Sequence, residues 1–190
     1  MKNVIIGKQF EDSENYQKFI KIVKERNIKV QVVEAGQRIN IEKDLYFDVL
    51  WPMSENAISE NSINNNSLVC KIVYRDFSML FTGDIEAIAE KAIFEKYKNT
   101  SILKSTILKV AHHGSRSSSM QEFLNVVRPK IALIGVGEKN TFGHPNSDVL
   151  ERLKKSGSKI FRTDKDGEIT IQINNKGRIW INKMIEAIEL

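Results

Sequence analysis

The chain has 190 residues and a mass of 21.8 kDa, which is the size of one ordinary domain. A composition of 41% hydrophobic and 28% charged residues excludes a disordered, collagen-like or low-complexity chain. The net charge of +5 is too small and too scattered to define a nucleic-acid surface. The single cysteine, Cys70, excludes a disulfide framework and a cysteine-rich zinc finger, and we expect a buried structural thiol.

No run approaches the ~18 apolar residues of a membrane span, and the first residues lack the apolar core of a signal peptide. We therefore expect a soluble chain with no membrane contact of its own. No internal repeat or flexible linker interrupts the sequence, so residues 1–190 are predicted to form a single domain.

Hydrophobic periodicity alternates along the chain between the two-residue repeat of strands and the repeat of about 3.6 residues that marks helices. Strands are predicted at residues 2–6, 28–33, 45–51, 67–74, 77–81, 106–111, 130–136, 159–162, 168–173 and 178–181. Helices are predicted at residues 14–26, 85–96, 120–127 and 148–155, with residues 85, 88, 89, 92 and 93 on one apolar face. Residues 54–67, rich in Asn and Ser, are predicted to form an irregular surface loop.

Three helix ends carry recognisable signals. Ser119 and Glu122 have the spacing of a capping box, which predicts a helix start at residue 120. Pro129 then stops that helix. Gly157 suits the left-handed residue that follows the helix at 148–155.

The order of these elements predicts the fold class. From residue 77 onward strands alternate with helices, which is typical of parallel strands joined by crossover helices, and a hairpin through residues 174–177 ends the chain. Earlier strands are adjacent, and those at 68–74 and 77–81 are joined by a turn at 75–76. We therefore expect an α/β fold whose sheet is mixed.

Three polar loops follow apolar strands, at the strand ends where open α/β sheets bind their ligands. These loops are residues 82–84, 112–116 and 143–145. Structural roles are the alternatives for two of these residues: Asp84 suits the N-cap position of a helix, and His144 could be a turn residue. The pair His112 and His113 indicates a functional role. Burying two imidazoles at the end of a strand costs desolvation free energy and gives no gain in packing.

The chemistry of these loops is consistent with a metal site. A carboxylate and imidazoles are ligands that zinc-class ions prefer, and a carboxylate can bridge two ions. Lys109, Ser115 and Arg116 are candidates to bind an anionic oxygen of a substrate. Strand alternation would send His112 and His113 in opposite directions, so we expect at most one of them to bind metal directly.

Several runs resemble the metallo-β-lactamase superfamily, and the closest likeness is to the C-terminal domain of ComEC-type DNA-internalisation competence proteins. The runs are Asn-Asn-Ser-Leu-Val at 65–69, Leu-Phe-Thr-Gly-Asp at 80–84, Leu-Lys-Val-Ala-His-His-Gly-Ser-Arg-Ser-Ser at 108–118 and Phe-Gly-His-Pro at 142–145. Residues 149–153 and 162–167 extend the resemblance, which spans residues 4–173. It implies an αββα sandwich of mixed sheets with outer helices, in which a metal-bridging water attacks a phosphoester or a similar bond.

The resemblance also implies roles for individual residues. Asp84 corresponds to the bridging aspartate and His112 to a metal ligand, with zinc or manganese as the ion. His113 would be a catalytic residue that faces the substrate or supports the ligand, and the roles of the two histidines can be exchanged. His144 would donate a proton to the leaving oxygen.

Substrate contacts are implied for Lys109, Ser115 and Arg116, and also for Asn66 and Ser67, which lie where many superfamily members have a further histidine. The implied substrate is DNA or another phosphoester. The resembling domains belong to membrane-anchored proteins, and the location of this chain stays open.

The family signature His-x-His-x-Asp-His should lie upstream, yet no histidine precedes His112. We therefore expect the C-terminal two-thirds of a hydrolase domain, inactive in isolation, that binds at most one ion weakly. A sheet face left uncovered would favour self-association. The alternatives are a catalytically degenerate binding or structural module, and a small α/β domain with a solitary metal or anion site at His112 and His113.

Overall fold

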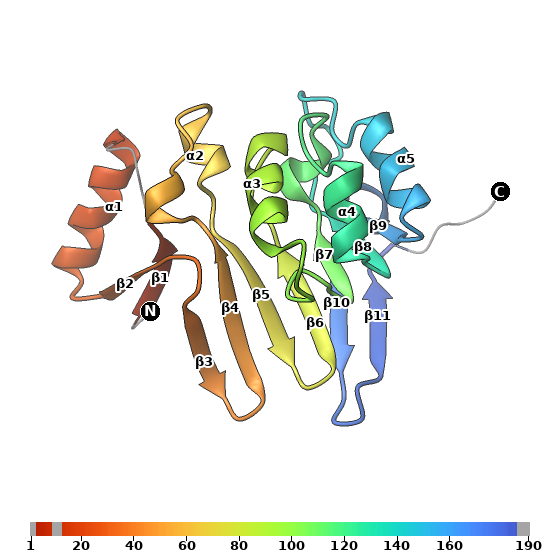
Figure 1. Cartoon of the computed structure of the whole chain (residues 1–190), viewed down its shortest axis with the longest axis horizontal. Coiled ribbons are helices and arrows are strands. Elements are labelled where there is room, and N and C mark those ends of the chain that lie inside the picture. The colour runs from red at the N-terminus through yellow and green to blue at the C-terminus, as the bar shows by residue number, and fades with distance from the viewer. Residues whose placement is uncertain (1–2, 9–12, 186–190) are drawn as a thin grey trace.

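A mixed seven-stranded sheet forms the centre of the computed structural model, which describes residues 3–8 and 13–185 (Figure 1). In spatial order its strands are β3 (Arg38–Glu42), β4 (Leu45–Trp51), β5 (Val69–Tyr74), β6 (Phe77–Phe81), β7 (Ile107–Lys109), β8 (Ile131–Ile134) and β9 (Lys159–Arg162). Strands β3 to β6 pair antiparallel, and β6 to β9 pair parallel. The predicted α/β class with a mixed sheet is therefore confirmed.

Three helices connect the parallel strands and lie on one face of the sheet (Figure 1). They are α3 (Ala87–Tyr97), α4 (Gln121–Val127) and α5 (Ser147–Lys155). Their apolar residues share one buried core with the strands, in which Leu80 and Leu108 contribute from the sheet and Ile93, Leu124 and Leu153 from the helices. Burial of these side chains is the main force that holds the layers together.

Smaller units flank the central sheet. Strand β1 (Asn3–Gly7) pairs in parallel with β2 (Lys29–Val33), and helix α1 (Glu14–Glu25) connects the two strands. Residue 2, which belongs to the first predicted strand, lies outside the described residues. The predicted hairpin is confirmed as β10 (Ile169–Ile173) and β11 (Ile179–Lys183). Short helical turns complete the fold: η1 (Ser54–Asn56), α2 (Ser62–Asn65), η2 (Ala111–Gly114) and α6 (Thr163–Asp166). Within the described part of the chain, no helix is long and apolar enough to cross a membrane.

Some local predictions were wrong. Strand β3 was missed, although Ile39 and Ile41 alternate with polar residues along it; it is five residues long, and four of the five are exposed. Ile88 was placed on the buried face of its helix, yet 42% of its surface is exposed. Asp84 does not cap α3, because the helix begins later and Glu86 occupies the N-cap position. Cys70 is half-buried, and burial raises the pKa of its thiol to about 11.

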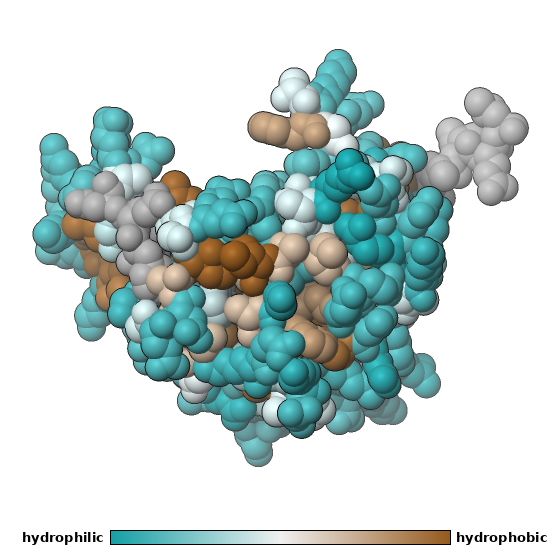
Figure 2. Space-filling model, turned by 45° about the horizontal axis from the view of Figure 1, so that its top comes forward, coloured by the Kyte–Doolittle hydropathy of each residue, from teal (hydrophilic) through white to brown (hydrophobic). Residues whose placement is uncertain are grey.

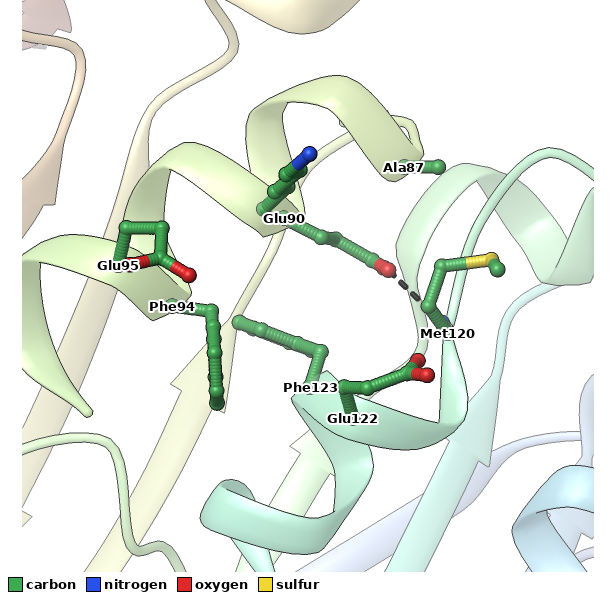
Figure 3. Close-up of a pocket in the computed structure, with 8 residues that line it drawn as sticks. Ala87, Glu90, Phe94, Glu95, Met120, Glu122 and Phe123 are labelled. Atoms are coloured by element: carbon green, nitrogen blue, oxygen red, sulfur yellow. Dashed lines mark hydrogen bonds between the residues drawn. The ribbon is translucent and has the colours of Figure 1, made fainter.

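The predicted capping box at the start of α4 is also wrong. Ser119 makes no side-chain cap there; instead the backbone N–H groups of Ser119 and Met120 donate to the Glu90 carboxylate, at 2.6 and 2.8 Å. Figure 3 shows this carboxylate reaching from α3 toward Met120, beside a hollow of about 350 Å³ that contains none of the predicted site residues. Burial raises the pKa of Glu90 to about 7, although both amide bonds and the charge of Arg152 act to lower it.

Candidate active site

The three polar loops predicted from the sequence meet at the carboxyl ends of β6, β7 and β8, which lie toward the top of Figure 1. The Asp84 loop depends on Gly83, whose φ of +53° lies in the left-handed region. A Cβ on Gly83 would lie 2.6 Å from the Cβ of Ser67, so no larger residue fits without movement. The Ser67 hydroxyl in turn accepts the backbone N–H of Asp84 at 3.3 Å.

The two adjacent histidines lie in a turn rather than on a strand. Strand β7 ends at Lys109, and both His112 (φ 47°) and His113 (φ 55°) adopt left-handed backbone conformations within η2. The predicted strand at 106–111 was therefore too long, and strand alternation does not set the direction of the two rings. Successive non-glycine residues in this region are strained, and such strain is concentrated at functional sites.

Backbone contacts hold this turn against the other two loops. The His112 N–H donates to the Gly83 carbonyl at 3.1 Å, and the Asn146 N–H donates to the Gly114 carbonyl at 2.9 Å. Gly114 has a φ of +81°, and a Cβ there would lie 2.6 Å from the Cβ of Pro145. The three loops are therefore packed at backbone level and form one structural unit.

Asp84 faces His113. The His113 Nε2 lies 3.6 Å from Asp84 Oδ1, and both side chains are about half exposed. On the other side of the ring, His113 Nδ1 lies 2.6 Å from the Gly135 carbonyl oxygen. Since a carbonyl oxygen only accepts, Nδ1 carries a proton, and the lone pair of the neutral ring is on Nε2, toward Asp84. Metal-binding histidines commonly have this arrangement.

His112 faces a different carboxylate. Its Nδ1 is buried without a hydrogen-bond partner and lies 3.5 Å from Glu86 Oε1. Burial acts to raise the pKa of Glu86, but hydrogen bonds from Asn61, Ser117 and Asn65, together with the charge of His112, bring it below its ordinary value. Because the two imidazoles face separate carboxylates, the geometry does not support one ion held by His112 and His113 together.

His144 lies between two other rings. Its ring centroid is 5.8 Å from that of His112, edge to face, and 5.9 Å from that of Phe142, which is stacked on it. Burial lowers the pKa of His144, and the charges of His112 and His113 lower it further. A lowered pKa leaves less protonated imidazole near neutral pH, which weakens the predicted role of His144 as a proton donor.

Two of the predicted substrate contacts are cationic. The Lys109 ammonium donates to the Val110 carbonyl at 3.1 Å; burial lowers its pKa, and the nearby Asp84 acts in the opposite direction. The Arg116 side chain is 80% exposed and lies 3.2 Å from Asp148. Both cations are therefore close to loops of the site, with Arg116 the more accessible.

The other predicted substrate contacts have internal partners. The Asn66 amide is buried, donates to the carbonyls of Ile58 and Ser62 and accepts the Ile58 N–H. Ser115 is buried and its hydroxyl bonds that of Ser117 at 3.0 Å. Together with Ser67, whose hydroxyl supports the Asp84 loop, these groups hold the loops in position.

Sequence reasoning missed Glu86 and Phe142 as site residues. Glu86 lies two positions after Asp84 and was assigned only to a helix, whereas Phe142 was noted only as part of a motif. Within residues 3–8 and 13–185, no group of three or more His, Cys, Asp or Glu side chains is arranged to hold a metal. Asp84 and His113 are thus a pair of donors rather than a complete ligand set.

Comparison with known proteins identifies relatives of this chain, although no protein-family model matches it. ComE operon protein 3 of Bacillus subtilis is 34% identical over 179 residues, which cover 94% of this chain and 22% of that protein. Competence protein ComA of Neisseria gonorrhoeae is 33% identical over 131 residues, covering 69% and 18% of the two chains. Recombination protein 2 of Haemophilus influenzae is 34% identical over 129 residues, covering 67% and 15%.

The chain spans about a fifth of the length of these relatives. The match to the Bacillus subtilis protein covers nearly the whole of this chain, including all three loops of the candidate site. The shared segment shows that the chain is related to the ComEC-type competence proteins.

Proposed function

We propose that the chain is part of a metal-dependent hydrolase that cleaves phosphodiester bonds of DNA during DNA uptake. Competence is part of the name of one relative, and recombination is part of the name of another. The observation that carries the proposal is the Asp84–His113 pair, whose Nε2 and Oδ1 atoms lie 3.6 Å apart at the carboxyl ends of the parallel strands. A metallo-β-lactamase-like domain over residues 1–190 is part of the same proposal.

Asp84 and His113 would hold the ion, and their donor atoms suit zinc or manganese. A bound divalent ion lowers the pKa of a water ligand and stabilises charge on a phosphate oxygen. Catalytic zinc usually has three protein ligands, so this pair would be part of a larger set. A preceding His-x-His-x-Asp-His segment of a longer protein would complete it, and this chain would be the C-terminal two-thirds of the domain.

The residues of the chain have supporting tasks in this proposal. The Gly135 carbonyl holds the proton of His113 on Nδ1 and thereby keeps Nε2 available as a donor. Arg116 is exposed and can attract phosphate. His144 can accept or hold a proton at its ring, and its lowered pKa favours the accepting form at neutral pH.

Calorimetric titration of the chain with Mn²⁺ or Zn²⁺ tests the ligand assignment. We expect at most one weakly bound ion per chain and at least about a tenfold loss of affinity in Asp84→Ala and His113→Ala, because removing a donor removes a metal bond. His112→Ala is the matched control and should keep the affinity. Loss in His112→Ala with retention in His113→Ala would restore the assignment predicted from the sequence.

The same preparation should not hydrolyse single- or double-stranded DNA efficiently, because the donor set is incomplete. Two ions bound in stoichiometric amounts, or robust hydrolysis abolished by Asp84→Ala, would contradict this expectation.

The second candidate is a catalytically degenerate module that binds DNA without cleaving it. The observation that favours it is the lack of any group of three metal-binding side chains among the described residues. DNA binding that persists unchanged in Asp84→Ala, without detectable metal binding by the wild-type chain, would support this candidate over the hydrolase.

A further inference from the structure

Phe142 is 80% exposed, and no large hydrophobic side chain in the described part of the chain is more exposed. Its loop, residues 135–146, rises above the carboxyl ends of the strands in Figure 1, and a projection stands clear of the molecular body at the top of Figure 2. An exposed phenyl ring forgoes the stabilisation that burial gives an aromatic side chain. A single exposed apolar residue is common on protein surfaces, so its location has to support any functional role.

The loop holds Phe142 in a defined place. Asn140 bridges the two sides of the loop: its amide donates to the carbonyls of Gly137 and His144, at 3.0 and 2.8 Å, and its oxygen accepts the His144 N–H at 2.9 Å. The Phe142 ring is stacked on His144 with an angle of 19° between the planes, and His144 meets His112 edge to face. The exposed phenyl ring is therefore the outer member of a row of rings that begins at the candidate active site.

A planar, uncharged ring with open surface matches the face of an unpaired nucleobase. Aromatic side chains bind single-stranded nucleic acids by stacking on bases, without regard to sequence, whereas bases in a duplex are already stacked on one another. Two exposed cations are available for the phosphates: Lys139 lies in the same loop, and Arg116 lies in the histidine loop, 80% exposed and 3.2 Å from Asp148. Stacking and phosphate attraction together are the two contributions that such binding uses.

We propose that Phe142 is a stacking platform for a base of single-stranded DNA and positions that strand across the Asp84–His113 pair. The inference rests on the proposed function, which supplies DNA as the substrate. Phe142 is a positioning residue, because it acts by holding the strand and touches no reacting atom.

Fluorescence anisotropy with two labelled strands separates stacking from phosphate attraction. One strand is a short oligothymidylate, and the other has the same backbone with abasic sites in place of the bases. We expect the wild-type chain to bind the base-bearing strand more tightly, and Phe142→Ala to weaken that binding by roughly 5- to 150-fold, the range that alanine substitution at base-stacking residues gives. Binding of the abasic strand should be unchanged.

Two variants serve as controls. Trp180→Ala removes an aromatic side chain that is 46% exposed on β11. The tip of this hairpin lies at the opposite end of the molecule from the polar loops (Figure 1). The variant should therefore bind both the base-bearing and the abasic strand as tightly as the wild-type chain does. Phe142→Trp should retain the preference for bases. When Phe142→Trp is combined with Trp180→Phe, the indole fluorescence should also be quenched by the base-bearing strand, while Trp51 is fully buried and contributes a constant signal.

The outcomes are distinct. Equal wild-type affinity for both strands, or equal loss for both strands in Phe142→Ala, would overturn the stacking proposal and leave the hydrolase proposal intact. No binding of either strand would overturn the stacking proposal together with DNA as the substrate. The metal titration with Asp84→Ala tests the hydrolase proposal separately, because it uses no DNA.

Discussion

At the scale of single residues, the described side chains divide into those that face the site and those that build it. Asp84 and His113 face each other across 3.6 Å, whereas Asn66 is buried and bonded within its own loop. The sequence placed Asn66 in the site because it lies within a motif. A motif position shows that a residue belongs to a region, but hydrogen-bond partners decide whether its side chain is available to a substrate.

Asn66→Ala should therefore lower stability rather than ligand binding. Loss of a buried amide leaves the Ile58 N–H and the carbonyls of Ile58 and Ser62 without partners, and we expect a decrease of about 2–3 kcal/mol in the free energy of unfolding. Urea unfolding measures this, with the exposed Asn56→Ala as the control. A variant as stable as wild type that loses DNA affinity would instead support the substrate contact predicted from the sequence.

A comparison of Gly83 with Gly143 separates two effects of replacing a glycine: steric collision of the new Cβ, and strain from a positive φ. Both have positive φ, +53° and +70°, but only at Gly83 would a Cβ meet another atom, the Cβ of Ser67 at 2.6 Å; at Gly143 nothing lies within 4 Å. Gly83→Ala should lower the free energy of unfolding by at least about 1 kcal/mol more than Gly143→Ala, and should also weaken metal binding. Equal effects in thermal unfolding and in metal titration would contradict this account.

At the scale of elements, a long-range contact determines how α4 begins. The Glu90 carboxylate on α3 accepts the N–H groups of Ser119 and Met120, the two residues directly before α4, where no side chain caps the helix. The sequence could predict both helices from their periodicity. It could not predict their connection, because residues 90 and 119 are distant along the chain and meet only when the layers pack.

The stability supplied by Glu90 should depend on pH. Its pKa rises from an ordinary value of 4.5 in the unfolded chain to about 7 in the folded chain, so its contribution is present below pH 4.5 and is lost as the pH rises through 7. We expect the unfolding free energy of wild type relative to Glu90→Gln to fall by about 3 kcal/mol over that interval. Urea unfolding at several pH values measures the difference, with the exposed Glu95→Gln as control. A difference that is independent of pH would contradict the prediction.

At the scale of the whole molecule, helices α3, α4 and α5 cover one face of the sheet. Side chains that alternate with the buried Leu80 point to the opposite face, and strand register places Phe47, Ile72, Met79 and Phe81 together there. All four are half-buried in the monomer. An apolar sheet face of this kind favours association.

We therefore expect the chain to self-associate as its concentration rises, as the sequence predicted for an uncovered sheet face. Light scattering over a concentration series measures this, and Ile72→Lys should shift the chain toward the monomer. Ile88→Lys, a change at an exposed residue of α3, is the control. A monomer at every concentration would contradict the role of this face.

The sequence by itself determined the mixed α/β class, the three polar loops and the order of the main elements apart from β3, because local periodicity reports which side of each element is buried. Tertiary structure decided that His113 rather than His112 faces Asp84, that Glu90 holds the chain at the start of α4, and that the phenyl ring of Phe142 extends the row of rings at the site. These features depend on a strained turn and on contacts between residues distant along the chain. Neither a repeat pattern nor a motif specifies the direction in which such side chains point.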